Sequence, residues 1–318
     1  MKNLAFILLL LLAVGLAVSV FSGPMGFSAP ESVVLSLRLP RALLAVLAGT
    51  SLAVSGCVLQ AILRNPLATP YTLGISAGAG VTAGIIILTG TAVPVLLVYL
   101  SGTAGALAAA GFTWFLAGRA VGNRDGATLI LAGVTVNLLG ASVLLFIEYL
   151  SPASRLIEII RWMMGNLSVA GYGRIIYLLP FTLGGLIFPF LKTGVLNQFL
   201  TGTEIAESRG VNTAREKKIL LGAAALLAGG AVGAVGPVGF VGLMVPHIIR
   251  RIAGGDYRRL LPLSALGGAV LVVWADIVSR TVLSPGELPI GIILSMLGGP
   301  FFLYLLLKKP CDSGFQET

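Results

Sequence analysis

Long uninterrupted apolar runs dominate the chain. Typical runs occupy residues 4–21, 42–63, 129–147, 260–277 and 288–307. The strands of a membrane barrel would instead alternate apolar and polar positions over about ten residues. A continuous apolar run in lipid needs a backbone that satisfies its own hydrogen bonds, which means a helix. The pattern therefore predicts an all-α bundle that crosses a membrane.

Glycines, prolines and charged residues divide the apolar sequence into segments near the ~20 residues that a crossing helix needs. The ten predicted spans are about 4–22, 42–63, 72–89, 93–117, 127–150, 174–191, 216–235, 238–252, 260–281 and 288–307. The first resembles a signal peptide, with Lys2 before an apolar core, but no Ala-x-Ala cleavage site follows and we expect a retained span. The span at 238–252 is short and rich in glycine.

Composition agrees with this pattern, because 57% of the residues are hydrophobic and only 10% are charged. An ordinary soluble domain carries roughly 25% charged residues, so a water-soluble enzyme is excluded. The expectation is one transmembrane domain over residues 1–318, a polytopic membrane protein of about ten helices.

The basic residues predict an orientation. With a cytoplasmic N-terminus, 15 of the 21 lysines and arginines fall in inner loops, and the outer side keeps six: Arg38, Arg41, Arg155, Arg161, Arg174 and Arg280. This asymmetry follows the positive-inside rule. It predicts a multi-pass protein of the cell (inner) membrane with both termini in the cytoplasm. Anionic lipid accounts for the net charge of +9 without any nucleic acid.

The groups needed for catalysis or metal binding are scarce. One histidine, His247, and two cysteines cannot build a closed metal site or a catalytic triad. A phosphate-binding loop is also absent from the sequence. We therefore predict that the chain is not an enzyme and binds no cofactor itself. His247 is interpreted as a structural hydrogen-bonding side chain.

Buried charge within the spans bears on ion coupling. Glu148 and Asp276 are the acidic residues inside apolar runs, and Arg280 follows Asp276 by one helical turn, on the same face. A carrier driven by an ion gradient usually needs an isolated carboxylate at mid-membrane. The pattern favours an Asp276–Arg280 ion pair, and an ion-gradient-driven secondary transporter remains the alternative function.

Three arginines lie on the predicted outer side, where the positive-inside rule disfavours basic residues: Arg38, Arg41 and Arg280. Guanidinium groups at an outer mouth would attract carboxylates of an anionic solute or of a docking protein. Alternatively, these side chains extend to lipid headgroups. The residues themselves do not separate the two interpretations.

The largest inner loop, 192–218, contains a short predicted helix that begins with a capping Thr203 and stops at Gly210. Such a helix beneath a membrane bundle could bind a cytoplasmic partner. A solvated linker is the alternative.

Several motifs, in this order, are similar to those of one family, the FecCD-type permeases. They include Arg38-Leu-Pro-Arg41, Trp162-Met-Met-Gly165, the run from Gly236 to Arg250, and Glu287-Leu-Pro-Ile-Gly291. The motif residues with structural interpretations are Asn65, Pro66, Gly236, Gly239, Pro246, His247, Arg250, Asp276, Glu287 and Pro289. FecCD-type permeases are the membrane subunits of ABC importers for iron-siderophores, haem and cobalamin.

The resemblance implies a type II ABC importer, built on a homodimer (or close heterodimer) of permease subunits with ten spans each. Two cytoplasmic ATP-binding subunits would carry the ATP and Mg, and an external substrate-binding protein would deliver the chelate for alternating-access transport. Arg38, Arg41 and Arg280 resemble the residues that receive the binding protein. The inner segment of about 197–215 resembles the ATPase-coupling segment, with contacts from Glu204, Ile205, Ala206, Glu207, Arg209, Gly210 and Val211. The glycines at 236, 239 and 242 serve either tight packing or a hinge.

Overall fold

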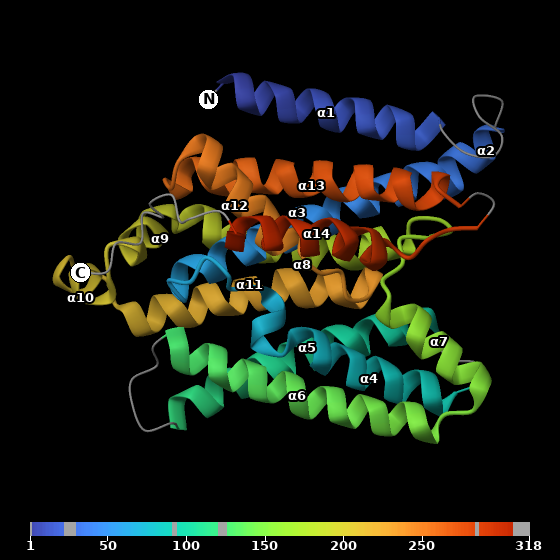
Figure 1. Cartoon of the computed structure of the whole chain (residues 1–318), viewed down its shortest axis with the longest axis horizontal. Coiled ribbons are helices and arrows are strands. Elements are labelled where there is room, and N and C mark those ends of the chain that lie inside the picture. The colour runs from blue at the N-terminus through green and yellow to red at the C-terminus, as the bar shows by residue number, and fades with distance from the viewer. Residues whose placement is uncertain (1, 22–29, 91–93, 120–125, 284–285, 308–318) are drawn as a thin grey trace.

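The protein is an antiparallel bundle of helices, shown by a computed structural model that describes residues 2–21, 30–90, 94–119, 126–283 and 286–307 (Figure 1). Over these residues the regular structure is helical, without strands. The elements are α1 (Lys2–Phe21), α2 (Glu31–Val33), the π-helix η2 (Val34–Arg38), α3 (Leu39–Ile62), the 3₁₀ turn η3 (Pro70–Leu73), α4 (Ile75–Thr89), α5 (Val95–Arg119), α6 (Gly126–Leu150), α7 (Ala153–Met163), α8 (Gly173–Leu191), α9 (Thr193–Leu200), α10 (Thr203–Ser208), α11 (Thr213–Val235), α12 (Val241–Ala253), α13 (Tyr257–Thr281) and α14 (Ile290–Leu307).

Each of the ten predicted spans coincides with a helix, but the spans are unequal in length. Within the described ranges, seven helical stretches are long and apolar enough to cross a membrane. By contrast, α4 has 15 residues and α12 has 13, and the apolar part of α14 is also short. The expectation of about ten crossing helices therefore holds only roughly.

The segments directly before α4 and α12 are not α-helical: the 3₁₀ turn η3 precedes α4, and residues 236–240 precede α12. The Val238 N–H donates to the Tyr71 hydroxyl at 2.7 Å, which joins the two entering segments. Gly236, at φ +76°, ends α11 and turns the chain. Non-helical backbone at membrane depth is tolerated where protein buries it. The predicted junction of the seventh and eighth spans at Gly236 is confirmed.

Helix α3 is the centre of the bundle, because nearly all of its side chains are buried against α8, α11, α12 and α13. Glycines let the backbones approach closely. A Cβ added to Gly56 would lie 1.9 Å from the Gly242 carbonyl oxygen, and one on Gly49 would lie 2.2 Å from that of Gly268. Small residues are the usual means of close helix contact in membranes. Gly242 therefore lies at a close contact between α3 and α12.

The two ends of the bundle carry different structures. One end holds the start of α1 together with α9 and α10, and the opposite end holds α2 and α7 (Figure 1). The sequence interpretation missed α7, an 11-residue helix that presents Ile159 to the core and charged side chains outward. Its stripe of apolar positions is too short to distinguish from a loop by hydropathy.

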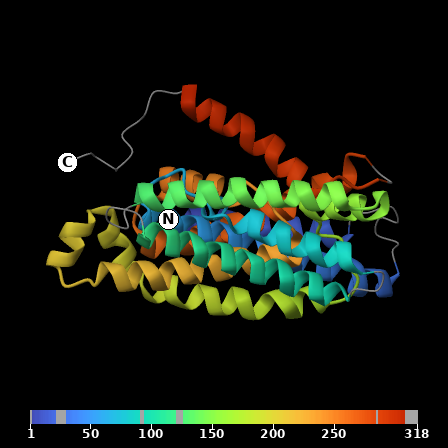
Figure 2. The same cartoon turned by 90° about the horizontal axis from the view of Figure 1, so that it is seen from below.

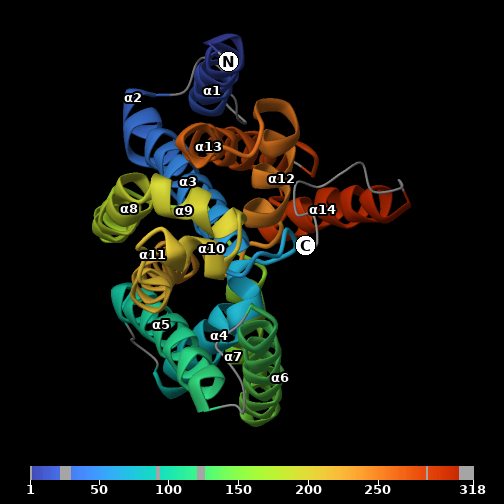
Figure 3. The same cartoon turned by 90° about the vertical axis from the view of Figure 1, so that its left-hand side faces the viewer.

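Helix α14 leaves the bundle along its length (Figures 2 and 3). Its first residues are tied down, since the Gly291 N–H donates to the Met164 carbonyl at 3.1 Å. Further along, the Phe240 ring packs where a Cβ on Gly298 would otherwise lie. Outside these contacts α14 presents apolar side chains outward, and Met296 is 68% exposed.

Candidate docking, transport and coupling sites

A buried ionic network lies at the α2–α7 end of the bundle. The Arg41 Nε lies 2.9 Å from Asp276 Oδ1, and its Nη1 lies 2.9 Å from each Glu287 carboxylate oxygen. Arg280 Nε completes the network at 3.2 Å from Asp276 Oδ2. Asp276 is 1% exposed and is therefore enclosed between two guanidinium groups. The predicted pairing of Asp276 with Arg280 is confirmed.

Three separate parts of the chain position this network. Arg41 follows Pro40 just after the π-helix η2 passes into α3, within the continuous helical stretch Glu31–Ile62. Asp276 and Arg280 lie one turn apart on α13. Glu287 precedes α14 and is positioned by its neighbour Leu288, whose N–H donates to the Ser279 carbonyl at 3.0 Å.

Glu287 is ionised at neutral pH. Burial raises the pKa of its carboxyl, but the hydrogen bond from Ser168 Oγ at 2.8 Å and the Arg41 charge outweigh it, and the pKa lies below its ordinary range. The network thus contains two carboxylates and two guanidinium groups in close contact.

The three arginines predicted to dock a partner, Arg38, Arg41 and Arg280, lie close together, but their side chains are largely buried. Arg38 donates to the Val20 carbonyl at 3.1 Å, and Arg280 donates to Ser19 Oγ at 2.9 Å, so both hold the end of α1. Arg41 is engaged in the ionic network. These side chains stabilise the chain itself, and their docking role stays a prediction.

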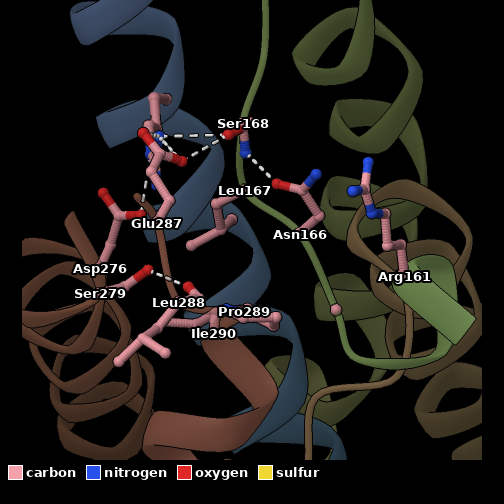
Figure 4. Close-up of a pocket in the computed structure, with 12 residues that line it drawn as sticks. Arg161, Asn166, Leu167, Ser168, Asp276, Ser279, Glu287, Leu288, Pro289 and Ile290 are labelled. Carbon is pink, nitrogen blue, oxygen red and sulfur yellow. Dashed lines mark hydrogen bonds and ion pairs between the residues drawn. The ribbon is translucent and has the colours of Figure 1, made fainter. Parts of the chain in front are cut away.

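A polar cavity of about 260 Å³ opens beside this network (Figure 4). Its polar lining comes from Arg41, Arg161, Asn166, Ser168, Asp276, Ser279 and Glu287. The sequence interpretation did not select Arg161, Asn166 or Ser168 as site residues. The motif from Trp162 to Gly165 was the available signal, because it joins Arg161 on α7 to Asn166.

A second cavity, of about 630 Å³, lies between α4, α7 and α14. Three of the six methionines, Met163, Met164 and Met296, line it with Ser76 and Ser295. Methionine side chains are flexible and polarisable, so they adapt to irregular apolar ligands.

At the opposite end, α10 forms the predicted short helix. The Thr203 cap was wrong by one position, because Gly202 caps the helix without a side-chain bond and Thr203 is its first residue. The glycine stop is present: Gly210 has φ +84°, and the Val211 N–H donates to the Ala206 carbonyl at 3.1 Å. This is the left-handed ending typical of helices that stop at glycine.

The predicted coupling residues lie on α10 and in the turn that follows it, and they differ in exposure. Ala206 is fully buried against its own chain, whereas Ile205 is 45% exposed. The remaining residues of the set are exposed or half-buried: Glu204, Glu207, Arg209, Gly210 and Val211. Glu207 also accepts a hydrogen bond from the Thr213 hydroxyl. The surface open to a partner therefore combines apolar Ile205 with the charged side chains of Glu204, Glu207 and Arg209.

The other motif residues have structural contacts. Asn65 Oδ1 accepts the Leu67 N–H at 2.8 Å, in the turn that contains Pro66. Arg250 donates to the Tyr257 hydroxyl at 3.2 Å. The His247 ring, one residue after Pro246, meets the Phe301 ring edge-on at 6.0 Å between centroids. A Cβ added to Gly239 would have open space around it, so packing does not require a glycine there. Pro289 begins the turn into α14.

In the part of the chain that the structure describes, no group of three or more His, Cys, Asp or Glu side chains could bind a metal ion together. Cys57 is buried as a free thiol. Cys311 lies outside the described residues.

Comparison with known proteins identifies the class of this bundle. The model of the FecCD transport family matches residues 3–308. The chain belongs to the FecCD transport family. The resemblance seen in the motifs is therefore confirmed over nearly the whole chain.

Individual members of the FecCD family are also similar to this chain in sequence. The chain is 40% identical to the hemin transport system permease protein HmuU of Yersinia pestis, over 86% of this chain and 83% of the relative. It is 39% identical to the cobalamin import system permease protein BtuC of Halobacterium salinarum, over 91% and 78% respectively. A solved structure of a putative metal-chelate type ABC transporter in an inward-facing conformation superposes with a TM-score of 0.89 at 26% identity, covering 96% of this chain and 99% of the other.

The FecCD assignment establishes an all-helical membrane permease of the ABC transporter type. Members of this family are transport subunits rather than enzymes, and they work with ATPase and substrate-binding partners. The apolar helices fit a multi-pass protein of the inner membrane.

Proposed function

We propose that this chain is the permease subunit of an ATP-driven importer that moves a metal chelate into the cytoplasm by alternating access. The observation that carries the proposal is the FecCD family match over residues 3–308, together with similarity to haem and cobalamin permeases over 86% and 91% of this chain. The chelate classes are iron-siderophore, haem and corrinoid.

We assign one end of the bundle to each expected partner. We place the α9–α10 end in the cytoplasm, where the exposed face of α10 would meet an ATP-binding subunit that holds ATP and Mg. The α2–α7 end would face outward and receive a substrate-binding protein. Both termini would then be cytoplasmic, in agreement with the positive-inside bias.

A second copy of the chain would complete the transport path. Helix α14 leaves the bundle (Figure 3), and Met296, Leu297, Leu303 and Tyr304 on it are exposed. Exposed apolar side chains in a membrane protein contact either lipid or another subunit. In a homodimer, the methionine-lined cavity beside α14 would contact the chelate as it passes. Thioether side chains suit a bulky, partly apolar cargo.

The alternative, a secondary carrier driven by an ion gradient, has less support. Asp276, the buried carboxylate that could move a proton, is held by Arg41 and Arg280 at 2.9 and 3.2 Å. Both carboxylate oxygens of Asp276 are engaged by these guanidinium groups, and a carboxylate held between two fixed cations is better suited to joining helices than to carrying protons.

The deciding experiment is transport in liposomes that contain this chain and its ATP-binding partner. The partner is first sought by co-purification, and uptake of haem, cobalamin and a ferric siderophore is then followed with the external binding protein present. We expect uptake of one chelate that requires ATP and survives collapse of the ion gradient. Uptake without any ATPase, abolished by that collapse, would establish the secondary carrier instead.

A further inference from the structure

Helix α9 lies at the end of the bundle where α13 begins, and it leads directly into α10 (Figure 1). Its side chains Leu196 and Phe199 are fully buried, and the helix packs against α3 and α13. Two residues, Thr201 and Gly202, separate α9 from α10. The placement of α9 therefore sets where α10 presents its exposed face.

Asn197 attaches α9 to the first turn of α13 through both ends of its amide. Its Nδ2 donates to Asp256 Oδ1 at 2.7 Å, and its Oδ1 accepts the Tyr257 N–H at 2.8 Å. The N–H groups in the first turn of a helix have no partner within that helix. Asp256 caps α13 by accepting the Arg258 N–H at 3.0 Å, and Asn197 supplies a second capping group from a different helix.

This contact fixes an orientation more than it adds stability. Asp256 is exposed to solvent and Asn197 is half-buried, so water can replace either partner of the bond between them. The hydrogen bonds from Asn197 and from the Arg258 N–H hold the pKa of the Asp256 carboxyl below its ordinary value. Asp256 is therefore a charged acceptor at neutral pH, and the Asn197 amide has one defined orientation towards it.

The start of α13 is in turn fixed to the centre of the bundle. Tyr257 is fully buried, and its hydroxyl donates to the Cys57 carbonyl on α3 at 3.2 Å and accepts from Arg250 on α12 at 3.2 Å. Helix α13 then continues for 25 residues. At 1.5 Å per residue, Asp276 of the ionic network lies about 28 Å further along the helix axis. One continuous helix thus joins α9 at one end to the ionic network at the other.

We infer that Asn197 is a positioning residue that makes α9, α10 and the start of α13 move as one unit when the ATP-binding subunits act. The inference rests on the proposed function, because it presumes that α10 meets such a subunit. A displacement of α10 then reaches α13 through Asn197, in addition to the covalent connection from α10 into α11. Without the amide, α9 keeps its buried apolar side chains but can turn about them, so hydrolysis moves α13 less.

The test measures the chelate imported per ATP hydrolysed by the assembled transporter in liposomes, with haem, cobalamin and a ferric siderophore each offered with the binding protein. The variant is Asn197→Ala, and the matched control is Asn65→Ala, whose amide oxygen accepts the Leu67 N–H within its own turn. We expect about a fivefold lower ratio for Asn197→Ala, since a hydrogen bond of this kind is worth a factor of about 2–10 in an equilibrium. For Asn65→Ala the change should stay below about twofold. Asn197→Ala should retain the ATP-binding subunit, because the exposed side chains of α10 are unchanged.

An exchange of the two side chains separates positioning from stability. Asn197→Asp alone places a second carboxylate beside Asp256, and repulsion between like charges should lower the ratio at least as far as Asn197→Ala does. Addition of Asp256→Asn restores one donor and one acceptor in the reverse order, so the ratio should recover to within about twofold of wild type. The melting temperature of each variant is recorded as well, because a purely structural role would lower it without changing the ratio.

An unchanged ratio for Asn197→Ala, in a complex whose wild type imports a chelate, would overturn the inference and leave the proposed function intact. Equal losses for Asn197→Ala and Asn65→Ala would also overturn it, and so would an exchange that recovers nothing. Loss of the ATP-binding subunit from Asn197→Ala would overturn it too, because the amide would then shape the binding surface rather than transmit movement. A wild-type complex without ATP-dependent import would overturn the proposed function itself, together with this inference.

Discussion

Replacement of Asp276 by asparagine should destabilise the bundle strongly. Asp276 is 1% exposed and contacts Arg41 at 2.9 Å and Arg280 at 3.2 Å. The asparagine side chain would keep the shape of the aspartate but leave two buried guanidinium groups with Glu287 as their remaining carboxylate. Breaking one partner of a buried ion pair costs about 3–5 kcal/mol.

The magnitude follows from the partners that remain. Glu287 still compensates Arg41, although its side chain is 44% exposed and solvent screens the attraction. We therefore expect the lower part of the range, about 3 kcal/mol. At roughly 2–4 °C per kcal/mol, this loss lowers the melting temperature by about 6–12 °C.

The assay is thermal denaturation in detergent, read as the fraction of protein that remains monodisperse after heating. Glu158→Gln is the matched control, because it removes a carboxylate from the exposed Arg155 pair, which is worth about 0–1 kcal/mol. Asp276→Asn and Glu158→Gln melting at the same temperature would refute the reasoning. Below its melting temperature, Asp276→Asn should still transport, since the carboxylate is structural. Loss of transport by a folded Asp276→Asn protein would favour a proton-carrying role.

Three further predictions concern other parts of the chain. Gly56→Ala should lower the free energy of unfolding by about 1–3 kcal/mol, because the added Cβ would lie 1.9 Å from the Gly242 carbonyl oxygen. The control is Gly111→Ala on α5, where the added Cβ has open space around it. This control should be neutral or slightly stabilising in the same melting assay. Ile205→Asp should weaken binding of the ATP-binding subunit, measured by co-purification, because it places a charge on the exposed face of α10; full recovery of the subunit would contradict the coupling role. The folded-state pKa of Glu287 lies below its ordinary value of 4.5, so its contribution to stability is present above about pH 4.5 and is lost as the pH falls through the folded pKa. The melting-temperature difference between wild type and Glu287→Gln should accordingly shrink on acidification, and a difference that does not depend on pH would contradict this.

The spans and the family could be predicted from the sequence because both depend on local or ordered patterns. The exclusion of polar backbone from lipid makes each apolar run a helix, and all ten predicted segments coincide with helices. The Asp276–Arg280 pair was also predictable, because one helical turn separates the two residues and sets their distance. Helix α7 was missed because its amphipathic pattern is only 11 residues long.

What the outer arginines contact was decided by the tertiary structure. Arg41 contacts Asp276 and Glu287, which lie 235 and 246 residues further along the chain. Spacing along the sequence cannot predict contacts at such separations. The sequence alone placed these arginines at the outer end and gave a partner within the chain to Arg280 only, namely Asp276. Packing of α3 against α13 buries them, and burial of a charge requires a partner. The same packing leaves Arg161 as the exposed cation beside the cavity, because α7 holds it at the edge of the bundle, away from the carboxylates that neutralise the others.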